Sequence, residues 1–143
     1  MRGKNKKKIL VGLGVVVLVV VALGYGLFHG YFDKGRFETK DAQWNANGKV
    51  AIIAERSDNA ALTSYIYFVL IADHLLSPSE LRRSYYSKTP VFGAASSCVS
   101  VRWEDPNNLV IACKDGVVGA AHIEFQEKQS GPVTIAYKNI PTK

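Results

Sequence analysis

A run of twenty residues without a charged side chain, residues 9–28, limits what this chain can fold into more than any other feature. Its sequence is ILVGLGVVVLVVVALGYGLF. An α-helix rises about 1.5 Å per residue, so a helix of this length is about 30 Å long and matches the hydrocarbon core of a bilayer. A helix also pairs its backbone groups within the segment, as a bilayer requires. We therefore predict a transmembrane helix over residues 9–28, in contact with membrane lipid.

The charges on the two sides of this segment predict its orientation. Residues 1–8 contain five of the 18 basic residues of the chain and no acid, so they account for +5 of the formal net charge of +6. Flanks rich in Lys and Arg stay in the cytoplasm. We predict a single-pass membrane protein with a cytoplasmic tail over residues 1–8 and a periplasmic or extracytoplasmic remainder. Because that remainder is close to neutral, the basic tail indicates topology rather than nucleic-acid binding.

A cleaved signal peptide is the alternative interpretation of the apolar segment. Ala22-Leu23-Gly24 offers small side chains at the spacing that signal peptidases accept, and residues 9–21 alone suffice for the apolar part of a signal peptide. The apolar character continues past this position to residue 28, which favours an uncleaved anchor. Both interpretations export the rest of the chain.

Two glycines at the predicted membrane edge bear on the oligomeric state. Gly26 and Gly30 have the small-xxx-small spacing that lets two membrane helices approach closely. This spacing is compatible with a homodimer, and flexibility at the helix end is the alternative explanation.

The rest of the chain predicts one small β domain. Residues 29–36 form a spacer, and residues 37–143 are enough for one compact domain but not for two. Runs of β-branched and aromatic residues, separated by turn residues, have the period of strands. These runs are residues 37–40, 49–55, 63–71, 91–94, 99–103, 109–113, 120–126 and 133–137. We predict a mainly antiparallel β sandwich or curled sheet of about six to eight strands with one short helix.

The short helix is predicted from a start signal between two strands. Ser77-Pro78-Ser79-Glu80 combines a Ser cap, a Pro in the first turn and a Glu three residues after the Ser. We predict a helix over residues 78–84. It lies in a long connection between residues 71 and 91, and long connections are often functional.

The same connection contains the candidates for partner binding, Arg82, Arg83, Tyr85 and Tyr86. Arg and Tyr are enriched at the important positions of protein interfaces because each combines a large contact area with a directional polar group. The alternative is an amphipathic turn whose tyrosines pack on the sheet while its arginines stay in water or at lipid headgroups. The sequence leaves both interpretations open.

The only two cysteines, Cys98 and Cys113, both lie in the predicted exported domain. The sequence between them predicts a β hairpin, and if Trp103 pairs with Asn108 the two cysteines are directly opposite each other. An oxidising compartment preserves such a bond, so we predict a structural disulfide, with two reduced thiols as the alternative. In this register the face that we expect to point to the core carries Val99, Val101, Trp103, Val110 and Ala112.

No residue pattern in the sequence indicates a catalytic, metal or cofactor site. The three histidines, His29, His74 and His122, have no spacing that suits a metal. Asp73-His74 suggests part of a catalytic triad, but no serine lies in a G-x-S-x-G motif. We therefore expect no enzyme and no cofactor. A small hydrolase that uses His74 or His122 is the alternative.

The stretch WNANGKVA at residues 44–51 resembles the W-S-P-D-G-K-x-x-A strand start of extracytoplasmic β domains, including single propeller blades. Asn45-Ala46-Asn47 stands where that motif has Ser-Pro-Asp. With residues 102–103, 109–111 and 133–137, the chain is similar in layout to small bacterial proteins with one N-terminal membrane span and one extracytoplasmic β domain. The resemblance implies no activity.

The functional hypothesis is a membrane-tethered protein-interaction module, an accessory subunit of an envelope complex at the bacterial inner (cell) membrane. Tethering a domain raises its effective concentration near membrane partners. An immunity or inhibitor protein against an exported toxin is the first alternative, and the small hydrolase is the second.

Overall fold

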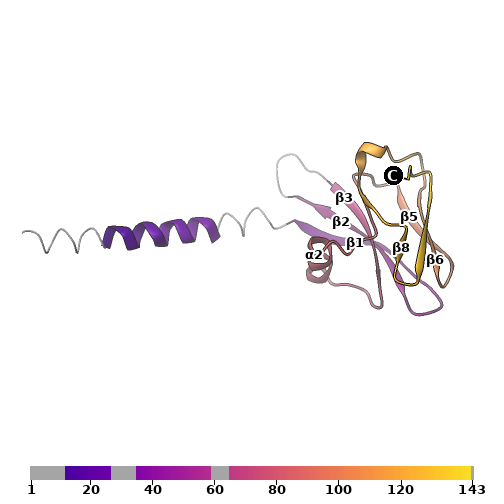
Figure 1. Cartoon of the computed structure of the whole chain (residues 1–143), viewed down its shortest axis with the longest axis horizontal. Helices are drawn as coiled ribbons and strands as arrows, with labels where there is room; N and C mark the ends of the chain where they lie inside the picture. The colour runs from indigo at the N-terminus through magenta and orange to yellow at the C-terminus, as the bar shows by residue number, and fades with distance from the viewer. Residues whose placement is uncertain (1–11, 27–34, 59–64, 143) are drawn as a thin grey trace, which may run out of the picture. The chain divides into compact units, whose positions relative to one another are not determined.

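The computed structural model describes residues 12–26, 35–58 and 65–142 of the chain (Figure 1). Its contacts divide the chain into two units, Met1–Lys34 and Gly35–Lys143. The first unit is helical where it is described, and the second is a mainly β domain with two sheets.

In the first unit, residues 12–26 form a helix whose side chains are exposed. Within the described part of the chain, no helix combines the length and the apolarity that crossing a bilayer requires. Other parts of the sequence predictions fall outside the described residues: the basic tail 1–8, residues 9–11 and 27–28 of the apolar segment, and residues 29–34 of the spacer with His29 and Gly30.

The β domain confirms the predicted fold class in its coarse form, because its described strands form two sheets (Figure 1). The five-stranded sheet has the order β1 (Arg36–Trp44), β2 (Val50–Ser57), β3 (Tyr65–Ala72), β4 (Phe92–Ala94) and β7 (Ile123–Gln126). The four-stranded sheet has the order β5 (Val99–Asp105), β6 (Asn108–Cys113), β9 (Val133–Lys138) and β8 (Gln129–Ser130). The helical elements of this domain are α2 (Pro78–Tyr86) and the 3-10 helix η1 (Ala120–His122).

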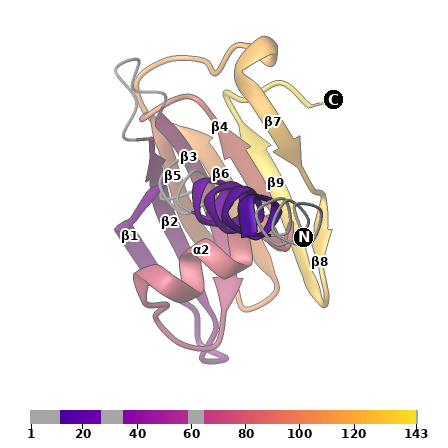
Figure 2. The ribbon, with the colours of Figure 1, turned by 90° about the vertical axis from the view of Figure 1, so that its left-hand side faces the viewer.

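Strands β2 and β3 carry apolar side chains on both faces, and both faces are covered. Successive side chains of a strand point to opposite faces. Ile53 and Val69 belong to the core that the two sheets share. Ile52 and Phe68 belong to a second cluster, which includes Leu81 of α2. The domain therefore has three layers, and Figure 2 shows α2 lying across the five-stranded sheet.

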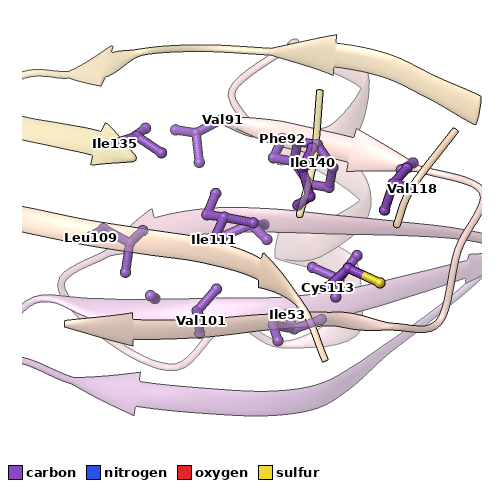
Figure 3. Close-up of a cluster of buried hydrophobic side chains, with 14 of the residues drawn as sticks. Ile53, Val91, Phe92, Val101, Leu109, Ile111, Cys113, Val118, Ile135 and Ile140 are labelled. Carbon is purple, nitrogen blue, oxygen red and sulfur yellow. The ribbon is translucent and has the colours of Figure 1, made fainter. Parts of the chain in front are cut away.

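The core between the sheets consists of aliphatic and aromatic side chains from both sheets and from the segments that connect them (Figure 3). Leu109 and Ile111 of β6 are fully buried there. Val118 and Ile140, which lie outside the strands, are buried in the same cluster. Burying one such side chain contributes about 1.5–3 kcal/mol, so this cluster is the main source of stability for the sandwich.

The described strand pairs are mainly antiparallel, as predicted, but the pairing of β6 with β9 is parallel. Leu109 pairs with Ile135, and Ile111 pairs with Tyr137. After β6 the chain adds β7 to the edge of the other sheet and returns through β8, so β9 runs in the same direction as β6. Parallel neighbours require such a long crossover, and the pattern of single strands does not reveal it.

The β5–β6 hairpin adopts a register one residue away from the predicted one. Trp103 pairs with Leu109 instead of Asn108, and Glu104 has no partner in the ladder between Trp103 and Asp105. Asp105 pairs with Asn108, so the turn is tighter than the predicted four-residue loop. The bulge at Glu104 is the physical cause of the difference.

This shift reverses the face that we predicted for β6, because a slip of one residue moves every side chain of a strand to the other face. Ile111 and Cys113 point into the core, together with Leu109. Val110 and Ala112, which were predicted to face the core, lie on the opposite face.

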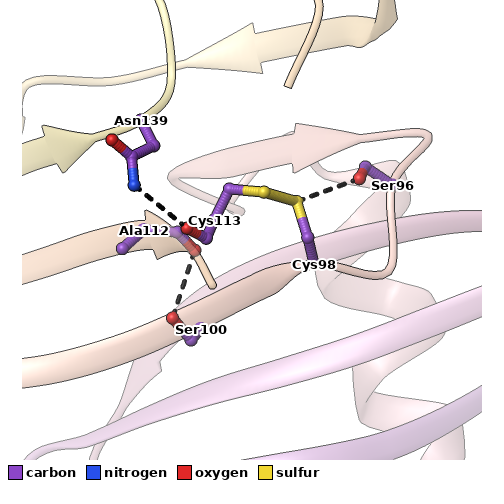
Figure 4. The surroundings of a disulfide bond; sticks show 6 residues. All are labelled: Ser96, Cys98, Ser100, Ala112, Cys113 and Asn139. Atoms are coloured by element: carbon purple, nitrogen blue, oxygen red, sulfur yellow. Dashed lines mark hydrogen bonds between the residues drawn. A yellow bond between two sulfur atoms is a disulfide. The ribbon is translucent and has the colours of Figure 1, made fainter. Parts of the chain in front are cut away.

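The predicted disulfide is confirmed (Figure 4). Cys98 and Cys113 are bonded with 4.8 Å between their Cα atoms, although Cys113 pairs with Val99 in the ladder. Ser96 Oγ lies 3.1 Å from Cys98 Sγ, and Asn139 Nδ2 donates to the carbonyl of Cys113 at 3.4 Å. The bond thus joins the residue just before β5 to the last residue of β6.

Candidate partner-binding surface

Helix α2 begins at the predicted capping box. The backbone N–H of Glu80 donates to Ser77 Oγ at 3.4 Å, and the backbone N–H of Ser77 donates to Glu80 Oε2 at 2.8 Å. Pro78 occupies the first turn. The helix ends at Tyr86, two residues beyond the predicted end, so both predicted tyrosines belong to its last turn.

Leu81 and Tyr85 attach α2 to the five-stranded sheet. They are four residues apart and therefore lie on the same side of the helix. Leu81 is only 1% exposed. The Tyr85 ring is half-buried, with its centroid 5.0 Å from that of Phe68 and 5.7 Å from that of Phe37. Tyr85 thus has the packing role that the alternative interpretation gave to both tyrosines.

Tyr86 is only partly packed. Its ring lies at 89° to the Tyr85 ring with 5.5 Å between the centroids, and 46% of the residue is exposed. The Arg82 guanidinium lies 5.9 Å from the centre of the Tyr86 ring. Arg83 is exposed. The structure therefore joins Arg82, Tyr85 and Tyr86 into one cluster and leaves Arg83 accessible on the helix.

Arg56 of β2 completes this cluster, and it was not among the residues predicted from the sequence. Its guanidinium lies 5.2 Å from the centre of the Tyr85 ring and 5.6 Å from that of Tyr86, and it pairs with Asp58 at 3.0 Å. Burial raises the pKa of Tyr85, and the hydrogen bond from Arg56 opposes this rise. The alternation of side chains along β2 could have identified Arg56, because it places Arg56 on the same strand face as Ile52.

Two hollows flank α2. A groove of about 680 Å³ lies between α2 and the edge strand β1, and it is lined by Gly35, Arg36, Phe37, Glu38, Thr39, Pro78, Ser79 and Arg82. A cleft of about 450 Å³ lies between the end of α2 and β7, and it is lined by Tyr85, Tyr86, Lys88, Pro90, Glu124, Phe125 and Glu127. The groove lining has more basic than acidic residues, and the cleft lining has more acidic than basic ones. The surface around α2 is therefore electrostatically polarised.

His74 lies between two carboxylates near the start of α2. Its Nδ1 is 2.6 Å from Asp73 Oδ1, and its Nε2 is 3.3 Å from Glu80 Oε1. The hydrogen bonds to Asp73 and Glu80 raise the pKa of His74. Ser77 Oγ donates to Glu80 Oε2 at 2.7 Å, so the nearest serine serves the helix cap.

His122 is an exposed residue of η1 whose backbone N–H donates to the carbonyl of Gly119 at 2.9 Å. It belongs to the segment 120–126, which was predicted as a strand; only residues from Ile123 onward form β7. Across the residues with described positions, no group of three or more His, Cys, Asp or Glu side chains is arranged to hold a metal ion.

Comparison with known proteins assigns the chain to no family. No protein-family model matches the chain. No curated protein and no solved structure shows significant similarity to it.

Proposed function

We propose that this chain is a membrane-tethered, extracytoplasmic protein-interaction module and an accessory subunit of an envelope complex. The observation that carries the proposal is the surface around α2. Arg82, Arg83 and Tyr86 belong to one short helix, and hollows of opposite net charge flank that helix. Such a combination of Arg, Tyr and concave surface is typical of protein interfaces.

The tether in this proposal is the apolar segment 9–28. The helix over residues 12–26 supports a helical conformation for most of that segment. The +5 charge of residues 1–8 supports a cytoplasmic N-terminus. The Cys98–Cys113 disulfide supports an oxidising compartment for the β domain, because such bonds are rare in the cytoplasm. A tether of this kind keeps the domain close to partners in the same membrane.

The firm attachment of α2 favours binding. Leu81 and Tyr85 hold the helix on the sheet, and the capping box of Ser77 and Glu80 defines its start. A surface that is ordered before association loses less conformational freedom when the partner arrives. The exposed side chains of α2 therefore contribute their contact energy with a small ordering cost.

We propose that the partner contacts side chains of α2 rather than adding a strand to β1. Strand β1 is an edge of the five-stranded sheet and borders the groove. It has a register shift between Thr39 and Asp41, and it carries charges at Arg36, Glu38 and Lys40. Bulges and charges on an edge strand oppose pairing with another strand. The groove is therefore a place for a side chain or a helix of the partner.

Photo-crosslinking in living cells tests this proposal. A benzoylphenylalanine replaces Ser79, which lines the groove, or Asn107, which is exposed in the β5–β6 turn. We expect one discrete crosslinked product in the membrane fraction from position 79 and none from position 107. Equal products from both positions, or no product from position 79, would contradict the proposal.

A second comparison shows whether the crosslink depends on the candidate residues. Arg82→Ala should reduce the product from position 79 by about tenfold or more, because truncation of a hot-spot residue, a class enriched in Arg, costs about 2 kcal/mol or more. Arg102→Ala is the matched control, because Arg102 is an exposed arginine of the four-stranded sheet paired with Glu104 at 3.1 Å. A product that is equally sensitive to both substitutions would argue against recognition by α2.

A further inference from the structure

The cleft between the end of α2 and β7 has the composition of a site for a positively charged group. Tyr85, Tyr86 and Phe125 supply aromatic surface, while Glu124 and Glu127 supply carboxylates. Aromatic rings attract cations through their negative faces, and carboxylates attract them directly. The cleft combines both kinds of attraction in one hollow of about 450 Å³.

Glu124 and Glu127 supply the negative charge of the cleft lining. Among the residues whose structure is described, neither Glu124 nor Glu127 pairs with a basic side chain. Tyr85 donates its hydroxyl to Glu124 Oε2 at 3.3 Å, which leaves the charge of this carboxylate in place. Among the described residues of the cleft lining, Lys88 is the single basic one. The lining therefore carries a formal excess of one negative charge.

Hydrogen bonds at Glu127 fix one wall of the cleft. The backbone N–H of Glu127 donates to the carbonyl of Val91 at 2.8 Å. The Tyr137 hydroxyl donates to the carbonyl of Glu127, and burial raises the pKa of Tyr137. Pro90, another residue of the cleft lining, is buried. Such a fixed site binds a ligand without first having to order itself.

Two guanidinium groups of the chain itself already lie over the tyrosine rings of this cleft. Arg56 lies over the rings of Tyr85 and Tyr86, and Arg82 lies over Tyr86. Tyr86 nevertheless keeps 46% of its surface exposed. A planar guanidinium can stack on an aromatic ring and bind a carboxylate through two parallel hydrogen bonds, which an ammonium cannot. Arginine fits this combination of rings and carboxylates better than lysine does.

We propose that the cleft receives an arginine side chain of the partner protein. This inference rests on the proposed function, and it names the chemistry that the partner must present to β7. In the bound state the guanidinium lies between Tyr86 and the carboxylates of Glu124 and Glu127. The groove on the other side of α2 has the opposite charge balance, so a partner with this arginine binds in one orientation.

Titration of the full chain in neutral detergent micelles tests the inference. The chain is labelled with 3-fluorotyrosine, and the ¹⁹F signal of Tyr86 is assigned by Tyr86→Phe. The probe is N-acetyl-arginine amide, and its neutral analogue is N-acetyl-citrulline amide. We expect the arginine probe to shift the Tyr86 signal with an affinity at least about tenfold higher than the citrulline probe, because charge-assisted hydrogen bonds are about twice as strong as neutral ones.

Substitution of the carboxylates locates the effect. Glu124→Gln combined with Glu127→Gln removes the charge and keeps hydrogen-bond acceptors, including the one that Tyr85 uses. This variant should lose the preference for arginine over citrulline. Glu104→Gln, a change in an exposed carboxylate of the four-stranded sheet, should retain it. Equal shifts with both probes, no shift with either, or an unchanged preference in the double variant would overturn the inference.

The titration is independent of the cellular partner. Absence of a crosslink from position 79 would contradict the proposed function and would leave the arginine preference measurable. Absence of the arginine preference would contradict the cleft assignment and would leave the crosslink measurable. The two failures are therefore distinguishable.

Discussion

The ring of Phe125 lies directly over the backbone of Gly93. The two residues pair across β4 and β7, and a Cβ atom placed on Gly93 would lie 2.3 Å from Phe125 Cζ. The centroid of the same Phe125 ring is 6.3 Å from that of the Tyr85 ring, and Phe125 lines the cleft beside α2. Because glycine has no side chain, the Phe125 ring can pack on the backbone of Gly93 and line the cleft.

Gly93→Ala should therefore destabilise the domain. The ring or the strand has to move to remove the clash, and overpacking of this kind costs about 1–3 kcal/mol. Urea unfolding of the full chain in micelles, followed by circular dichroism, measures the loss. In a Phe125→Leu background the same substitution should cost much less, because the clash is with the ring. An equal cost in both backgrounds would show that the ring is not the cause.

Leu81→Ala should loosen α2 from the sheet. Leu81 is 1% exposed within the cluster beneath the helix, and truncation of a buried Leu costs about 2–5 kcal/mol. Leu75→Ala is the control, since Leu75 lies just before the helix and is 55% exposed. Thermal unfolding should show a clearly lower midpoint for Leu81→Ala alone. If both variants unfold at the same temperature, α2 is not attached through Leu81.

The contacts of His74 predict a pH dependence of stability. Hydrogen bonds to Asp73 and Glu80 raise the pKa of His74 above 6.5, so its contribution is complete below pH 6.5 and is lost as the pH rises through the raised pKa. Hydrogen bonds from Ser77, and then the one with His74, lower the pKa of Glu80 from 4.5 to about 2. The contribution of Glu80 is complete above pH 4.5 and is lost as the pH falls towards 2.

The difference in melting temperature between the unmodified chain and His74→Asn should therefore be largest between pH 4.5 and 6.5 and should shrink at higher pH. His122→Asn is the control, because His122 is exposed and forms no ion pair with a described carboxylate. A difference that does not change with pH would contradict a role for the charged form of His74.

Removal of the disulfide should destabilise the sandwich. Cys98 and Cys113 are 15 residues apart, and a bond that closes a loop of this size is worth about 3 kcal/mol. The variant with Cys98→Ser and Cys113→Ser should lose that amount in urea unfolding. Reducing agent should weaken the unmodified chain by a similar amount and should not affect the variant. Sensitivity of the variant to the reducing agent would point to another cause.

Much of the β domain could be predicted because the local pattern and the tertiary structure agree. The β-branched and aromatic content of residues 49–55 and 63–71 predicted β2 and β3, and Ser77 with Glu80 predicted the start of α2. Residues 37–40 predicted only the first half of β1. Strand β8, Gln129–Ser130, is too short to produce a period and was missed. The bulge at Glu104 was missed as well, because a loop length does not show whether a residue leaves the ladder.

The candidate site was predicted only in part. The residues of α2 are close in sequence, so their common surface could be inferred. Arg56, Glu124 and Phe125 come from β2 and β7, and only the order of strands in the sheet brings them to α2. Sequence patterns specify faces, but long-range pairing decides which faces meet.

The most direct test of a tethered and oxidised exported domain is the intact mass of the protein extracted from membranes. The chain is alkylated before reduction in one sample and after reduction in another. We predict a chain that retains the whole of residues 9–28 and that takes up no label before reduction and two labels after it, one each on Cys98 and Cys113. A chain beginning at Tyr25 in the soluble exported fraction, or free thiols before reduction, would contradict this account.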